Sequence, residues 1–290
     1  MILIISDEED QSTNDVIYWL QSSGQSYIRL NRTSHLTLIS LQQESGKTKF
    51  SFWAEEEYIP GKRRMIHSDE ITAFWYRRGF LNFGNRQLAF NNQDDKTGRA
   101  LKTGINNYLK TENEKVYALI NYHFENNKTG IGSGSDNHLN KLIVNSKAQE
   151  AGLKIPSTLV TSSKASFLFF ESKAGACMAK AIDRAGFRIG TEFGIGNTNQ
   201  VLRAEKIDQM PETFNATLFQ QFISKLYDIR AIFINNRFYS AAILSQLNSQ
   251  TKDDFRNYDL FRPNRIIPYL LPKAIESKLS ILMNSLNLKS

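Results

Sequence analysis

Two apolar runs near the end of the chain, joined by three polar residues, constrain the fold more than any other feature. Residues 231–234 read A-I-F-I, residues 238–243 read F-Y-S-A-A-I, and Asn-Asn-Arg stands between them. Apolar runs of this length around an Asn-rich turn predict a β-hairpin. Asp228 and Arg230 stand at its entrance. Because a charge is costly to bury without a partner, these two residues need a counter-charge or a ligand.

The remaining segments predict an α/β protein of three parts, since β-branched and aromatic runs alternate with segments of helical spacing. We expect residues 1–125 to form an N-terminal α/β domain, residues 126–215 a central lobe and residues 216–290 a C-terminal lobe. In the first domain the expected strands are 2–5, 28–30, 36–41, 49–53 and 71–77, and the expected helices are 13–22, 94–110 and 112–122. In the lobes we expect helices 138–151, 165–171 and 273–286, strands 177–182 and 218–223, and a hairpin of strands 188–191 and 198–203 around Gly194-Ile195-Gly196.

Composition narrows the partners that the protein can have. The chain of 290 residues has a net charge of +7, and its basic residues are scattered. Such a surface suits a phosphate-rich cofactor or an acidic peptide, and with no zinc-ligand spacing nucleic acid is not the expected partner. The single Cys177 excludes an internal disulfide, and no apolar run reaches the ~20 residues of a membrane helix. We therefore expect a soluble, cytoplasmic protein without a membrane partner.

Five short motifs stand in a fixed order in the second half of the chain. They are N-K-L at 140–142, A-K-A-I at 179–182, Q-Q-F-I at 220–223, D-I-R at 228–230 and D-F-R-N-Y at 254–258. From His138 to Arg265 this order resembles the ATP-grasp ligases, whose fold clasps ATP between two lobes. The N-terminal I-L-I-I-S-D-E-E-D and the segment A-F-W-Y-R-R-G at 73–79 are similar to the graspetide (microviridin-like) peptide maturases of the grasp-with-spasm type.

The resemblance implies roles for the motif residues at phosphate, ribose and adenine, and at the transferred phosphoryl group. The cofactor-binding residues that it implies are Lys141, Lys180, Gln220, Gln221, Phe222, Ile223, Asp228 and Arg256. The catalytic residues that it implies are Arg256, Arg230 and Asn257. A planar guanidinium suits bidentate contact with oxyanions. Taken singly, the same residues also fit a solvated lysine, a core strand, a surface ion pair between Asp228 and Arg230, or an ordinary loop arginine.

The activity that the resemblance implies is ATP-dependent ligation on a peptide. With ATP and Mg²⁺, such an enzyme activates Asp or Glu side chains of a ribosomally made precursor peptide as acyl phosphates, and a leader segment supplies recognition. Intramolecular esters or amides result. A glutamate ligase of the ribosomal-protein-modifying type is the alternative enzyme, and formation of a homodimer stays open.

One expected motif is missing. ATP-grasp ligases hold Mg²⁺ with an Asp and a later Glu-x-Asn pair, and no Glu-x-Asn follows Arg256. No metal ligand is therefore predicted, and we expect a chain that is shortened at its C-terminal end. This observation favours a further alternative, a non-catalytic module that binds a nucleotide or a peptide.

Overall fold

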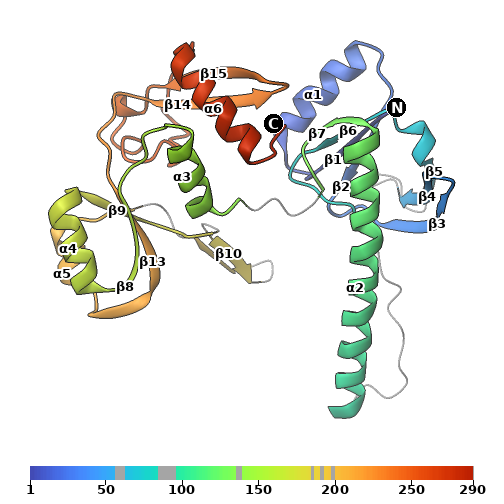
Figure 1. Cartoon of the computed structure of the whole chain (residues 1–290), viewed down its shortest axis with the longest axis horizontal. Coiled ribbons are helices and arrows are strands. Elements are labelled where there is room, and N and C mark those ends of the chain that lie inside the picture. The colour runs from blue at the N-terminus through green and yellow to red at the C-terminus, as the bar shows by residue number, and fades with distance from the viewer. Residues whose placement is uncertain are drawn as a thin grey trace. The chain divides into compact units, whose positions relative to one another are not determined.

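The chain folds into two compact units, Met1–Asn137 and His138–Ser290 (Figure 1). The computed structural model describes residues 1–55, 63–83, 96–134, 139–183, 186–189, 193–196 and 200–289. Both units combine helices with β-sheets, which confirms the predicted α/β class. Within the described ranges, no helix is long and apolar enough to cross a membrane.

A parallel four-stranded sheet of order β2-β1-β6-β7 organises the first unit. Its strands are β1 (Ile2–Ser6), β2 (Tyr27–Asn31), β6 (Ala73–Tyr76) and β7 (Thr129–Ile131). β1 lies inside the sheet and its Leu3, Ile4 and Ile5 are fully buried, as expected where both faces are covered. Helix α1 (Gln11–Ser22) follows, capped by Asp10, whose carboxylate accepts a hydrogen bond from the backbone N–H of Thr13.

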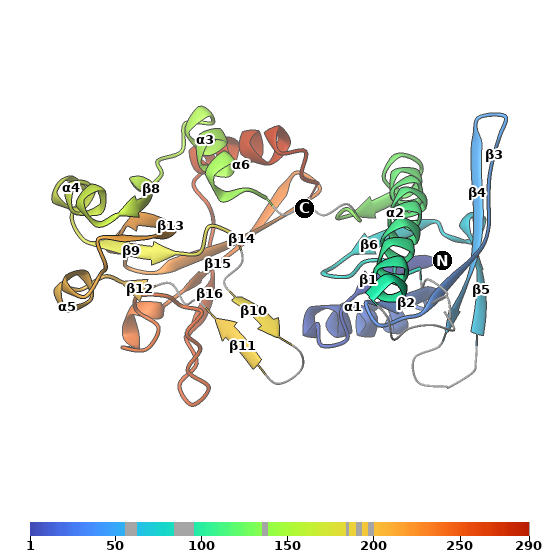
Figure 2. The ribbon, with the colours of Figure 1, turned by 90° about the horizontal axis from the view of Figure 1, so that it is seen from below.

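An antiparallel sheet and a long helix complete the first unit. The sheet consists of β3 (Leu36–Glu44), β4 (Lys47–Glu55) and β5 (Arg63–His67), followed by the short helix η1 (Ser68–Glu70) (Figure 2). The long helix is α2 (Lys96–Asn127). Its Ile120 and Phe124 are buried with Phe50 of β4 and Phe74 of β6. These aromatic contacts join the helix to both sheets of the unit.

The continuity of α2 corrects one prediction. The sequence analysis places two helices at 94–110 and 112–122, whereas one helix runs through Thr111. The hydroxyl of Thr111 donates to the carbonyl oxygen of Asn107, so its hydrogen-bonding capacity is met inside the helix. A polar residue at this position therefore does not end the helix.

An antiparallel sheet of order β12-β9-β13-β8 begins the second unit. Its strands are β8 (Thr158–Ser163), β9 (Cys177–Lys180), β12 (Gln200–Val201) and β13 (Thr213–Gln221), and its helices are α4 (Lys164–Ala174) and α5 (Ala204–Asp208). Phe167 of α4 and Ile207 of α5 pack with Cys177 and Phe219 from the sheet. Cys177 is thus a free cysteine that is buried in the core.

The predicted hairpin forms the second sheet of this unit. β14 (Asp228–Ile234) and β15 (Arg237–Ile243) pair antiparallel, and β16 (Ile266–Pro268) pairs with β15. Asn235 and Asn236 connect the strands with φ angles of 48° and 60°. Two consecutive positive φ angles are the geometry of a type I′ turn, which matches the twist of a hairpin and favours Asn over most residues. The short helix η2 (Ser245–Leu247) follows β15.

Two helices that are far apart in sequence lie side by side in the second unit. α3 (Lys141–Glu150) and α6 (Lys273–Ser285) share a small core of Ala148, Ala151 and Leu282 (Figure 1). The ammonium of Lys278 also donates to the carbonyl oxygen of Gly152 at 2.8 Å.

A second hairpin differs from its prediction. β10 (Gly186–Ile189) pairs with β11 (Phe193–Gly196), so residues 194–196 lie in a strand rather than in the expected turn. The strand β12 pairs with β9 instead of with residues 188–191. Glycine is a turn signal, but it also occurs in strands where the backbone must stay accessible. Residues 190–191 and 198–199 of the predicted strands lie outside the described residues.

Residues 222–227 connect the two sheets of the second unit. The sheet before them ends with Gln221, and the sheet after them starts with Asp228. The two-lobe organisation of this unit stays a proposal. The expected lobe boundary between residues 215 and 216 falls inside β13, and we propose this connection as the boundary instead.

Candidate functional site

Lys180 stands at the centre of the candidate site. It ends β9, is partly buried, and its ammonium donates a hydrogen bond to the side-chain oxygen of Gln220 on β13. Gln220 in turn donates to the hydroxyl of Thr158 on β8 at 3.1 Å. Side chains of three neighbouring strands therefore hold the Lys180 ammonium in place.

Three further cations interact electrostatically with Lys180. Burial lowers the pKa of Lys180, and the charges of Arg256, Lys141 and Lys225 lower it further, while Asp254 raises it. Such a concentration of positive charge is unfavourable in the absence of an anion, because like charges repel. The arrangement therefore favours a ligand with several negative charges.

Lys141 reaches the site from the first turn of α3. Its ammonium donates to the carbonyl oxygens of Ala181 at 2.8 Å and of Asp183 at 2.7 Å. Asn140 caps α3 by accepting hydrogen bonds from two backbone N–H groups, which fixes the start of the helix. Lys141 thus binds the backbone that directly follows Lys180.

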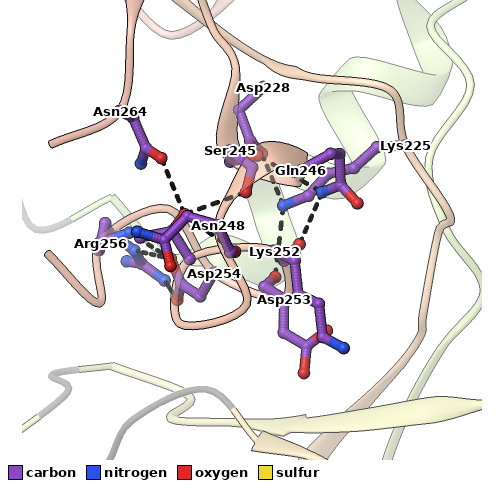
Figure 3. Close-up of polar contacts among 11 residues, drawn as sticks. Lys225, Asp228, Ser245, Gln246, Asn248, Lys252, Asp253, Asp254, Arg256 and Asn264 are labelled. Carbon is purple, nitrogen blue, oxygen red and sulfur yellow. Dashed lines mark hydrogen bonds and ion pairs between the residues drawn. The ribbon is translucent and has the colours of Figure 1, made fainter. Parts of the chain in front are cut away.

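Arg256 contributes the guanidinium of the site. Its Nε and Nη2 donate to the two carboxylate oxygens of Asp254 at 2.9 and 2.6 Å, as Figure 3 shows. These hydrogen bonds raise the pKa of Arg256, which therefore stays charged. The rest of the side chain is accessible, since 56% of it is exposed.

Asp228 lies in a second polar cluster next to Arg256. Its carboxylate accepts hydrogen bonds from Lys225 at 2.9 Å and from the Ser245 hydroxyl at 2.6 Å (Figure 3). Arg230 is exposed and makes no polar side-chain contact with the described residues. Asp228 and Arg230 therefore do not form the surface ion pair that the sequence allows. Lys225 takes that place because the connection after β13 brings it beside Asp228.

A loop between β15 and β16 carries Arg256. The backbone N–H of Leu244 donates to the carbonyl oxygen of Arg265 and closes the loop at its base. Inside it, the hydroxyl of the fully buried Thr251 lies 3.0 Å from the carbonyl oxygen of Ser245 and 2.8 Å from Oδ1 of Asn264. A loop closed at its base and pinned at its centre holds its side chains in defined positions.

Asn257 has a smaller part than the sequence suggests. Its backbone N–H donates to the carbonyl oxygen of Asp254 at 3.1 Å, which closes the turn that carries Arg256. Its side chain makes no hydrogen bond with the described residues. In the structure Asn257 therefore stabilises the turn through its backbone N–H. A catalytic contact of its side chain stays a prediction.

The predicted adenine hinge is only partly available to a ligand. The backbone N–H of Gln221 donates to Ser157, and that of Phe222 donates to Ala176. The next N–H, that of Ile223, makes no backbone hydrogen bond with the described residues, and Ile223 is half exposed. The hinge role therefore narrows to the backbone around Ile223.

Three residues of the site were not predicted from the sequence: Lys225, Ser245 and Thr251. The spacing of Lys225 and Asp228 was a usable signal, since oppositely charged residues three apart often pair near a turn. Ser245 and Thr251 carry no signal of their own, because small hydroxyl residues are common in loops. Their roles depend on contacts that only the folded chain creates.

The carboxylates of the site do not assemble a metal cage. Across the part of the chain that the structure describes, no group of three or more His, Cys, Asp or Glu side chains could hold a metal ion. Asp228 and Asp254 are engaged by Lys225 and Arg256. The described residues thus suit a polyanion rather than a free divalent cation.

Solved structures show which fold this is. No family model matches the chain, and no curated protein matches it. A RiPP-associated ATP-grasp ligase of Chryseobacterium gregarium, solved with ADP and a leader and core peptide, is 23% identical with a TM-score of 0.71, over 99% of this chain and 82% of that one. The macrocyclase MdnC of Microcystis aeruginosa MRC, bound with precursor peptide MdnA, is 19% identical with a TM-score of 0.65, over 100% and 85% of the two chains. The ATP-grasp ligase PsnB, complexed with minimal precursor, Mg and ADP, is 13% identical with a TM-score of 0.61, over 99% and 81%. The chain therefore has the predicted ATP-grasp fold.

Proposed function

We propose that this protein is an ATP-dependent ligase that cross-links side chains of a ribosomally made precursor peptide. The observation that carries the proposal is a group of four cations, which consists of Lys180 and the three that act on it. This group lies on the fold of ligases that were solved with ADP and peptides. A triphosphate matches the charge of this group.

The proposed chemistry has two steps. An oxygen of an Asp or Glu side chain attacks the γ-phosphorus of ATP, the bond to the β–γ bridging oxygen breaks, and ADP leaves. A Ser or Thr hydroxyl, or a Lys amine, then attacks the resulting acyl phosphate. Phosphate leaves, one proton is released, and an ester or an amide forms. Such transfers depend mainly on positioning and on stabilisation of charge.

Each cation of the site has a place in this scheme. Lys141 and Lys180 bind the phosphates, and Arg256 stabilises the charge of the γ-phosphoryl group as it moves. Arg230, exposed and free of polar contacts with the described residues, is available to the carboxylate of the peptide. Asp228 acts through the cation beside it, because it orients Lys225.

Mg²⁺ is the second component of the proposed cofactor. When bound with ATP, it neutralises phosphate charge and binds oxygen ligands. The described residues supply no cage for it, so no step is assigned to a metal here.

Mass spectrometry tests the function directly. The chain is incubated with MgATP and a candidate precursor peptide rich in Thr, Asp, Glu and Lys, and each cross-link removes one water from the peptide mass. Arg256→Ala should abolish the loss of water while leaving ATP binding largely intact. Arg237→Ala is the matched control, since Arg237 is exposed beside the hairpin turn and makes no polar side-chain contact with the described residues.

Three outcomes contradict the proposal. Dehydration that persists in Arg256→Ala removes the role of Arg256. A mass gain by added glutamate residues on a protein tail identifies a glutamate ligase instead. Absence of ATP binding in the unmodified chain overturns the ligase as a whole.

A further inference from the structure

We propose that Asp254 is a positioning residue of this site, which orients the guanidinium of Arg256. The inference rests on the proposed function only for the identity of the ligand, a nucleoside triphosphate.

The evidence for this inference is the set of hydrogen bonds that the Asp254 carboxylate accepts. The Asp254 carboxylate accepts three of them from Arg256: from the backbone N–H at 3.0 Å, from Nε at 2.9 Å and from Nη2 at 2.6 Å. A guanidinium has five N–H bonds, so three remain on the edge that faces away from Asp254. Asp254 thus fixes one edge of Arg256 and leaves the opposite edge for an oxyanion.

Asp254 is well suited to orient its partner, because it is buried and its backbone takes part in a hydrogen-bonded turn. Only 9% of Asp254 is exposed, against 56% of the Arg256 side chain. Its carbonyl oxygen accepts the backbone N–H of Asn257 in the turn, and the buried Thr251 pins the same loop three residues earlier. The exposed guanidinium of Arg256 is therefore held by a buried carboxylate.

A consequence of this placement concerns the charges. Burial and the charges of Arg256, Lys141 and Lys225 lower the pKa of Lys180, whereas the Asp254 carboxylate raises it and so acts as a counter-charge. Asp228 is engaged by Lys225 and by the Ser245 hydroxyl. Without Asp254, Lys180 would lose its proton at a lower pH, and a neutral amine binds phosphate poorly.

The test compares Asp254→Asn with Asp253→Asn. Both variants remove one carboxylate, but the Asp253 side chain makes no polar contact with the described residues. The pKa of Lys180 is measured without nucleotide, by a pH titration of its ¹³Cε signal in lysine-labelled protein, with Lys180→Arg to assign the signal. Asp254→Asn should lower this pKa, and Asp253→Asn should leave it unchanged. Equal values in the unmodified chain and both variants overturn the inference.

Calorimetry with MgATP then tests the orienting role. Asp254→Asn should weaken binding roughly tenfold, since a hydrogen-bonded charge is left without its partner. Asp254→Glu keeps the charge but displaces Arg256, so it should keep the pKa of Lys180 and still weaken binding. Binding as strong as that of the unmodified chain in Asp254→Glu contradicts the orienting role. If the unmodified chain binds no MgATP while Asp254→Asn lowers the pKa of Lys180, the proposed function fails and the counter-charge stands.

Discussion

Lys180 is an ordinary strand lysine in the sequence and a partly buried one in the fold. Its environment gives it a special character: an amide accepts its hydrogen bond, three cations surround it, and one carboxylate opposes them. Burial and like charges lower the pKa of a lysine, and a bound anion has the opposite effect. Protonation of Lys180 and binding of an anion are therefore coupled.

The first consequence concerns ATP binding and pH. Lys180→Ala should weaken MgATP binding by roughly tenfold or more, because a charge-assisted contact is lost. In the unmodified chain, affinity should be full below the pKa of Lys180 and fall as the pH rises through it. Because burial lowers this pKa, the fall should start below the range of an exposed lysine. Calorimetry across alkaline pH measures both effects.

Lys173→Ala provides the control at this scale. Its ammonium lies over the ring of Phe169 on the exposed side of α4, away from the hydrogen bonds of Lys180. Loss of this cation should leave the affinity and its pH dependence unchanged. Equal losses in Lys173→Ala and Lys180→Ala would show that only the overall charge of the protein matters.

At the scale of elements, the loop that carries Arg256 differs from the hairpin beside it. The hairpin is stabilised by a ladder of backbone hydrogen bonds and a type I′ turn. The loop depends on a few side chains, with Thr251 at its centre. Its stability therefore rests on single residues, whereas that of the hairpin is distributed.

Thr251→Val should loosen this loop. Valine has the shape of threonine but cannot donate the one hydroxyl hydrogen that Thr251 offers to Ser245 or Asn264, and a buried acceptor left without its donor costs about 1–3 kcal/mol. Hydrogen exchange at the backbone N–H groups of Thr251 and Asn257 measures this loss as faster opening. Thr217→Val on β13 is the control: Thr217 is partly exposed and its hydroxyl makes only a local hydrogen bond, to the carbonyl oxygen of Asn215, so stability should change by less than about 0.5 kcal/mol.

Comparison of the two elements explains what the sequence predicts well. The hairpin was predicted close to its true strands, because apolar runs and paired Asn residues are local signals. The loop was not, since Thr251 acts through contacts with residues up to thirteen positions away. The short motifs are local signals too, and they indicated Lys180 and Arg256. Lys225, which pairs with Asp228 instead of Arg230, was not predicted from the sequence. The predicted break in α2 is absent, because the Thr111 hydroxyl donates a hydrogen bond to a carbonyl oxygen of the preceding turn.

At the scale of the whole molecule, all residues assigned to the nucleotide belong to the second unit. Lys141 opens that unit, and Arg256 lies in its last sheet. The first unit has its own core of aromatic and aliphatic side chains. We therefore expect the proposed nucleotide binding not to depend on the folding of the first unit.

A fragment of residues 138–290 should bind MgATP with an affinity close to that of the whole chain. Units with their own core commonly fold alone. Calorimetry compares the fragment with the whole chain, and residues 1–137 serve as the control that should show no binding. Binding that needs both fragments together would assign part of the nucleotide site to the first unit.

The pairing of α3 with α6 has a consequence for the order in which the protein folds during synthesis. Gly152 and Lys278, which meet in that contact, are 126 positions apart. At the usual rate of about 5–20 residues per second, α3 waits roughly 6–25 s on the ribosome before its partner helix is made. During that time the apolar side of α3 lacks its partner helix, so this core of the second unit cannot form until α6 has been made.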